Sequence, residues 1–155
     1  MNRIILLLFA LTFLFNSSEG QIVLKEALSE RQTYYKINAS LNPETKIVTG
    51  EMEAYWVNKS PDLVPDIRLH LYMNAFRNNK STLYKEMGFS PGKDSTGYGW
   101  IDINSITDEA SNDLARYMQY ISPDDGNPHD MTVMKIDLPH AAEPGDTVFL
   151  RIDFK

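Results

Sequence analysis

Three histidines are the first residues of this chain that could bind a metal or move a proton: His70, His129 and His140. No two of them have the i, i+4 spacing of an H-E-x-x-H helix, which zinc proteases use to place two imidazoles on one helix face. We therefore predict that this chain is not a zinc hydrolase by itself. His70 falls on a predicted strand and is interpreted as a packing or surface residue, whereas His129 and His140 are predicted to lie in solvated turns.

An aspartate-rich stretch at 122–130, S-P-D-D-G-N-P-H-D, could suggest calcium. An EF-hand loop needs oxygen ligands at alternate positions and a glutamate at its twelfth position. Here Asp124 and Asp125 are adjacent, Pro128 interrupts the stretch, and no such glutamate follows. A solvated turn is the preferred interpretation.

Glu51 and Glu53 share one face of a predicted strand and could be read as a paired acid and base. Charges on the exposed face of an antiparallel sheet are the simpler interpretation. The chain has no G-x-S-x-G turn, no glycine-rich phosphate loop and no cysteine, which argues against serine and thiol nucleophiles. The sequence thus predicts no catalytic, cofactor-binding or metal-binding residue in this chain.

Aromatic residues offer a different chemistry, because exposed rings can form a carbohydrate-binding platform. The candidates are Tyr55, Trp56, Tyr72, Phe76 and Trp100. Trp56 and Phe76 are expected to fill the core. Trp100 lies beside Gly97 and Gly99 and is the best candidate for an exposed aromatic residue.

Residues 1–20 match a secretory signal peptide. Arg3 supplies a basic start, the run 4–15 is apolar, and Ser18 and Gly20 are small residues before a cut at Gln21. A membrane anchor is the alternative, but a span needs roughly 20 apolar residues and this run is shorter. We expect an exported chain (periplasmic, cell-surface or extracellular) with no membrane span after cleavage. The acceptor patterns at Asn38, Asn58 and Asn79 matter only if the source glycosylates exported proteins.

Charge and cysteine content narrow the class of protein further. The formal net charge is −6 and there are no cysteines. A mildly acidic surface argues against nucleic acid and anionic lipid as partners. Small secreted domains often need disulfides to offset a small core. The core must therefore suffice here, or another domain must cover part of it.

Short alternating segments set the expected fold. Tyr35, Ile37, Ala39 and Leu41 share one face of a first strand, and further strands are predicted at 46–58, 67–72, 100–106, 131–138 and 148–154. Residues 114–121 read as a strand or as a short amphipathic helix, 81–85 as a helical turn, and 90–97 as a loop. The sequence predicts an all-β antiparallel sandwich or saddle at 33–155, preceded by a lead-in segment at 21–32.

Several motifs, taken in order, resemble the amino-terminal domain of the aminopeptidase N family of zinc metallopeptidases. Tyr34-Tyr-Lys-Ile-Asn-Ala-Ser-Leu-Asn-Pro43 is similar to the family's first strand, and the next strand carries Gly50 and Asn58 at the family's spacing. Leu69-His-Leu-Tyr-Met-Asn74 and the stretch 138–154, with Pro144-Gly145, are similar to its later segments. The insertion at 74–99 is similar to the longer form of secreted bacterial members. The resemblance covers 33–155.

The resemblance implies a β-saddle domain that packs on a downstream thermolysin-like catalytic domain of the same polypeptide. That domain would supply the zinc ligands, the catalytic glutamate and the peptide-binding strand, so zinc belongs to the parent enzyme and not to this chain. We expect a non-catalytic supporting domain that walls the substrate cleft, incomplete at its carboxyl end. The alternative is a free-standing secreted β-sandwich binding module, for example one for carbohydrate that uses Trp100 and nearby tyrosines.

Overall fold

The computed structural model describes residues 28–88 and 97–155. The predicted signal peptide, residues 21–27 of the lead-in segment and most of the predicted loop at 90–97 lie outside the described residues. The chain divides into two compact units, Met1–Glu30 and Arg31–Lys155. Every strand described below belongs to the second unit.

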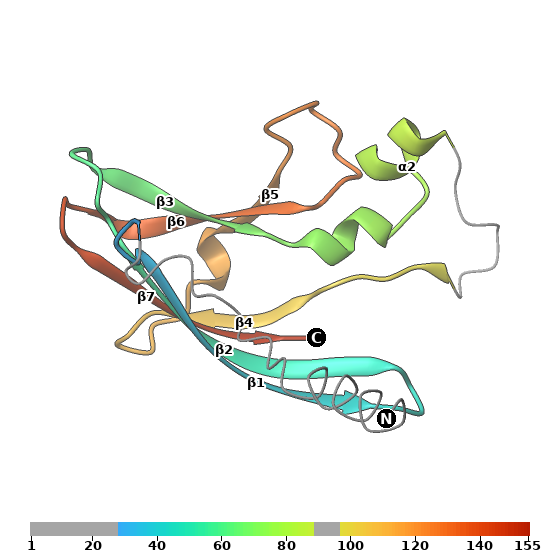
Figure 1. The fold of residues 1–155 in the computed structure, drawn as a ribbon, viewed down its shortest axis with the longest axis horizontal. Helices are drawn as coiled ribbons and strands as arrows, with labels where there is room; N and C mark the ends of the chain where they lie inside the picture. The colour runs from blue at the N-terminus through green and yellow to red at the C-terminus, as the bar shows by residue number, and fades with distance from the viewer. Residues whose placement is uncertain (1–27, 89–96) are drawn as a thin grey trace, which may run out of the picture. The chain divides into compact units, whose positions relative to one another are not determined.

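Two antiparallel sheets form this unit (Figure 1). The four-stranded sheet has the order β1 (Thr33–Asn42), β2 (Ile47–Val57), β7 (Thr147–Phe154) and β4 (Ile103–Thr107). The three-stranded sheet has the order β3 (Val64–His70), β6 (Val133–Ala142) and β5 (Met118–Ile121). The predicted all-β antiparallel fold is confirmed.

Three short helical elements lie between the strands: η2 (Tyr72–Phe76), α2 (Thr82–Met87) and η4 (Ala115–Tyr117). The helix α2 confirms the helical turn predicted at 81–85, and Gly88 ends it in the left-handed conformation that favours glycine at this position. Both interpretations of 114–121 are partly right, because η4 is followed directly by β5.

The core lies between the two sheets. Ala54 of β2, Ile106 of β4 and Ile136 of β6 are buried there, together with Leu114, Leu150 and Ile152. The alternation of apolar and polar residues in β2, β6 and β7 explains this arrangement, since every second side chain faces the opposite sheet. The strand β1 contributes no residue to this buried cluster.

The strand β6 is longer than the sequence predicted. It continues past Pro139 to Ala142, so the prediction that His140 lies in a turn is wrong. The register explains how a proline is accommodated: Val64 lies opposite Ala142, whereas Asp66 lies opposite Asp137, so the pairing is irregular where Pro139 falls. A proline that has no N–H is tolerated at such an irregularity.

Like charges face each other across β3 and β6. Asp66 is in register with Asp137, and Arg68 with Lys135. Each charge is paired within its own strand instead: Arg68 contacts Asp66 at 3.0 Å, and Lys135 contacts Asp137 at 2.9 Å. The charges thus balance along each strand and not across the sheet.

The inner face of β1 is uncovered. Tyr35 and Ile37 lie opposite Ala54 and Met52 of β2, so their side chains are on the face that bears the core. Nevertheless, both are 55% exposed, and Leu41 and Val48 on the same face are 62% and 44% exposed. We call these four residues, Tyr35, Ile37, Leu41 and Val48, the β1 patch. The predicted shared face of Tyr35, Ile37 and Leu41 is confirmed, but this face is exposed.

Candidate functional site

The three histidines lie apart from one another on different elements. His70 ends β3 and stacks on Tyr72, with ring centroids 3.9 Å apart. His129 is exposed in the loop before β6, and His140 is exposed on β6 itself. The described part of the chain holds no group of three or more His, Asp or Glu side chains that could bind a metal ion. His70 is thus a surface residue, as the sequence suggested.

Two of the three aspartates in 122–130, Asp125 and Asp130, accept hydrogen bonds from Thr82 of α2. Asp130 Oδ1 accepts the Thr82 N–H at 2.9 Å, in the first turn of the helix, where backbone N–H groups lack partners within the helix. Asp125 accepts the Thr82 hydroxyl at 2.6 Å and the Asn127 N–H at 2.9 Å. The Thr82 hydrogen bond is the main reason that the pKa of Asp125 lies below its usual range. Anchoring of α2 explains why aspartates gather here.

The two glutamates of β2, Glu51 and Glu53, lie on the outer face of the larger sheet, and Glu53 pairs with basic residues of the neighbouring strands. Glu53 lies between Lys36 on β1, at 3.6 Å, and Arg151 on β7, at 3.5 Å. Glu51 is exposed and stands opposite Asp153 of β7. A row of alternating charges across three strands is typical of a solvated sheet face.

The aromatic residues do not form one platform. Tyr55 belongs to a row on the outer sheet face, with Tyr34 at 6.0 Å and Phe149 at 4.9 Å between ring centroids. These rings are tilted by 61° and 56°, so the row stabilises neighbouring strands and presents no flat surface. Trp100 is exposed, as predicted. Phe76 is 41% exposed, so its predicted place in the core is wrong.

Trp100 borders a hollow of about 390 Å³ that no motif in the sequence predicted. Val48 of the β1 patch, Met73, Tyr98 and Phe154 line it, and Lys46 and Lys155 contribute the charged groups. The residues come from separate parts of the chain, so spacing alone could not have grouped them. The hollow is mainly apolar.

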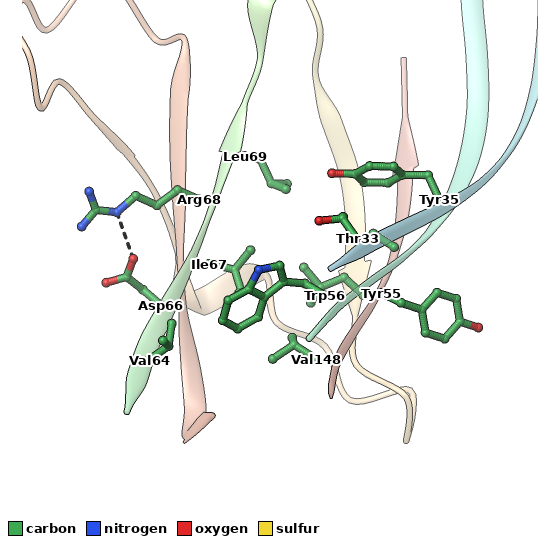
Figure 2. A pocket seen from close by; sticks show the side chains of 12 residues that line it. Thr33, Tyr35, Tyr55, Trp56, Val64, Asp66, Ile67, Arg68, Leu69 and Val148 are labelled. Carbon is green, nitrogen blue, oxygen red and sulfur yellow. Dashed lines mark hydrogen bonds and ion pairs between the residues drawn. The ribbon is translucent and has the colours of Figure 1, made fainter. Parts of the chain in front are cut away.

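A second, longer opening separates β1 from β3. One part, with a volume of about 340 Å³, is lined by Tyr35 of β1, Trp56 of β2 and Ile67 of β3. Figure 2 shows the indole of Trp56 extending between Ile67 and Val148, while Arg68 is turned toward Asp66. A neighbouring hollow of about 510 Å³ shares Tyr35, Arg68 and Leu69. The charged groups of the first hollow, Asp66 and Arg68, bind each other, so the opening is suited to apolar contacts.

Two buried asparagines hold the framework together. Asn58 donates from Nδ2 to the carbonyls of Asp62, at 2.8 Å, and Ala142, at 3.0 Å, and its Oδ1 accepts from the N–H and hydroxyl of Ser60. Asn74 donates to the Met131 carbonyl and accepts from the Ile101 N–H, both at 3.0 Å. Both amides are fully buried.

These contacts give structural roles to the motif positions. Asn58 joins the end of β2 to the end of β6, and the backbone carbonyl of Asn58 accepts the Gly145 N–H at 2.7 Å. Gly50 is required because a Cβ there would lie 2.6 Å from Phe154 Cζ and 2.8 Å from the Asn38 carbonyl oxygen. Both Nδ2 hydrogens of Asn58 are used, so the folded chain has no room for a glycan at this acceptor pattern, whereas Asn38 and Asn79 are exposed.

Within 28–88 and 97–155, no helix has the length and apolar character needed to cross a membrane.

No family model, curated protein or solved structure that was compared with this chain matches it. The resemblance to the aminopeptidase N family therefore stays a prediction.

Proposed function

We propose that this chain is the non-catalytic β-domain of an exported zinc peptidase of the aminopeptidase N type. Its work is to support a catalytic domain of the same polypeptide and to wall one side of the peptide-binding cleft. Zinc and the hydrolytic groups belong to that other domain.

The observation that carries this proposal is the β1 patch. Its four apolar side chains lie on the core-bearing face of the larger sheet, yet they are between 44% and 62% exposed. Exposed apolar residues that lie together on one face are typical of protein–protein, membrane or ligand contacts when the patch is large. Full burial of such a side chain stabilises a fold by about 1.5–3 kcal/mol. A domain laid against this face would gain that burial.

The openings beside β1 support the same role. Two hollows run between β1 and β3, and the only charged residues in their described lining are the mutually paired Asp66 and Arg68; the uncharged polar groups come from His70, Thr33 and tyrosine hydroxyls. A surface that offers shape and apolar contact without free charge suits a supporting contact better than catalysis. The motif residues Gly50, Asn58 and Asn74 maintain the fold, as expected for a framework domain.

The gene tests the proposal first. The reading frame beyond codon 155 should encode an H-E-x-x-H helix followed by a further glutamate. In the enzyme encoded by that frame, Ile37→Asp should lower both the midpoint of thermal unfolding and peptidase activity, because it places a charge in the domain contact. Ser40→Asp is the matched control, since Ser40 is exposed, lies on the outer face of β1 and pairs with the uncharged Thr49. A stop codon after Lys155, or equal effects of the two variants, would contradict the proposal.

A second candidate function has one observation in its favour. Trp100 is 44% exposed at the rim of the hollow formed with Tyr98 and Val48, an arrangement on which a sugar ring could stack. A free-standing carbohydrate-binding module would be retarded in native gels that contain a soluble polysaccharide such as xylan or laminarin. Trp100→Ala should abolish the retardation, and Tyr72→Ala, at a more exposed ring outside that hollow, should not.

A further inference from the structure

Within the described part of the chain, one row of backbone hydrogen-bonding groups on β1 has no strand partner. Val57 donates its N–H to the Gln32 carbonyl at 2.9 Å, and these two residues continue the register of Thr33 with Trp56. Hydrogen-bonded pairs alternate along an antiparallel ladder. The even-numbered residues of β1 therefore bond to β2, and the odd-numbered residues, from Thr33 to Leu41, point their N–H and C=O groups the other way. No strand of the described chain pairs with that side.

The bonds on the far side of β2 agree with this assignment. Asn58 donates its N–H to the Asp146 carbonyl of the next connection at 2.8 Å, so the residue after Val57 faces β7. The free edge of β1 can be followed in Figure 1, where β1 is the outermost strand of the four-stranded sheet.

The other three edge strands carry features that discourage strand addition. The strand β3 contains Pro65 and an irregular register, β4 has an irregular register between Ile103 and Ser105, and β5 has only 4 residues. Natural edge strands are protected in these ways. In contrast, β1 has 10 residues, regular pairing, no proline and one charged residue, Lys36. Lys36 is the only feature of β1 that discourages strand addition, so β1 is the least protected of the described edges.

We propose that this edge is a homodimer interface, in which β1 pairs with β1 of a second copy in antiparallel orientation about a two-fold axis. The two-fold contact uses the β1 edge of both copies, so such an assembly closes at two copies and does not continue into a fibre. The dimer contact uses the backbone edge of β1, whereas the domain contact proposed above uses the inner face of the same strand.

Pairing along nearly the whole of β1 (Thr33–Asn42) requires a two-fold axis near its centre, at Ile37 or Asn38. Odd-numbered residues must pair with odd-numbered residues, since only these have free N–H and C=O groups. An axis at Lys36 would place two lysines opposite each other, with no acidic residue in β1 to offset them. An axis at Ile37 places Tyr35 opposite Ala39, and an axis at Asn38 places Tyr35 opposite Leu41. Both keep Lys36 opposite an uncharged residue.

The pairing also gives the β1 patch apolar neighbours. Because odd residues meet odd residues, the inner faces of both copies stay on the same side of one continuous sheet. With the axis at Asn38, Tyr35 of each copy lies opposite Leu41 of the other; with the axis at Ile37, the two Ile37 side chains lie opposite each other. Part of the apolar surface that one copy exposes becomes buried in the pair.

Single cysteines test the interface directly, because the chain has no cysteine of its own. Directly opposed residues of an antiparallel pair have Cα atoms about 4.5 or 5.5 Å apart, which suits a disulfide. Ile37→Cys or Asn38→Cys should form a disulfide-linked dimer under mild oxidation, according to the position of the axis. Val48→Cys is the control, with similar exposure on β2. Failure of both edge variants to cross-link, or equal cross-linking of the control, would overturn the proposal.

Sedimentation of the purified chain supplies an equilibrium test. The chain should show a concentration-dependent monomer–dimer distribution. Ile37→Pro removes one free-edge N–H from each copy and no bond to β2, so it should raise the dimer Kd by about 30-fold. Ala39→Pro, which also removes a free-edge N–H, is the substitute variant if Ile37→Pro does not fold, and it should raise Kd similarly. Ile37→Val keeps the N–H and is the control, so it should leave Kd nearly unchanged. A chain that is monomeric throughout the micromolar range would refute the interface.

Discussion

Removal of the Asn58 side chain tests the framework most directly. In Asn58→Ala, the Ala142 carbonyl loses its donor at a buried position, and Asp62 and Ser60 lose their partners nearer the surface. A buried acceptor left unsatisfied costs about 1–3 kcal/mol, and a hydrogen bond whose groups can return to water costs about 0.5–1.5 kcal/mol. We expect the free energy of unfolding to fall by about 3 kcal/mol, which corresponds to a decrease in Tm of roughly 10 °C.

Urea unfolding followed by circular dichroism, at one fixed protein concentration, measures this loss. Asn58→Asp is the informative companion, because it keeps the acceptor for Ser60 but faces the Ala142 carbonyl with a second acceptor. At neutral pH it should be at least as destabilising as Asn58→Ala, and part of the loss should return at acidic pH, where the protonated carboxyl can donate. Asn79→Ala, at an exposed asparagine, is the control. A loss below about 0.5 kcal/mol for Asn58→Ala would place it among ordinary surface changes and refute the reasoning.

Three further predictions concern other parts of the chain. Gly50→Ala should lower the free energy of unfolding by about 1–3 kcal/mol in the same urea assay, because its Cβ would overlap the Phe154 ring and a backbone oxygen. Gly99→Ala should lower it by less, because the close contact of its Cβ is with the end of the flexible Met73 side chain. A larger loss for Gly99→Ala than for Gly50→Ala would contradict the packing argument. The depressed pKa of Asp125 means that its carboxylate stabilises the fold above the unfolded pKa and that this stabilisation is lost as pH falls through the folded pKa. Wild-type stability should thus fall more steeply than that of Asp125→Asn as the solution is acidified below about pH 4, where the hydrogen bond from Thr82 loses its charged acceptor; parallel curves would contradict this. The purified chain should retain no stoichiometric zinc after dialysis and should not hydrolyse aminoacyl-arylamides, and bound zinc measured by atomic absorption would show that the assignment of the metal to another domain is wrong.

Alternation of apolar and polar residues predicted most of the strands, because a sheet with one covered face imposes a period of two on its sequence. The same pattern could not show which strands the opposite sheet covers. Tyr35 and Ile37 alternate as regularly as Ala54 and Trp56, yet β1 extends beyond the buried core and stays exposed. Coverage depends on the number of strands in each sheet, which is a property of the tertiary structure.

The buried asparagines show a second limit of sequence reasoning. Asn58 matched a glycosylation pattern and Asn74 a family motif, but neither match revealed that the amide is fully buried. Their partners, Ala142 and Met131, are distant in sequence, so no local pattern could identify them. Likewise, the sequence predicted a turn at 122–130 and a helical turn at 81–85, but it could not show that Asp125 and Asp130 accept hydrogen bonds from Thr82 of that helix.

The like charges across β3 and β6 bear on how the smaller sheet finds its alignment. A slip of two residues keeps every side chain on its own face, and in one direction it would bring Arg68 opposite Asp137. Neither the alternation of apolar and polar residues nor the pairing of charges therefore disfavours a sheet whose strands are shifted by two residues. The correct alignment depends on contacts at the two ends of the pair, where Leu71 donates its N–H to the Thr132 carbonyl at 2.6 Å and Asn58 holds the Ala142 carbonyl. The amide of Asn58 therefore helps to fix the register of β3 with β6, although Asn58 belongs to neither strand.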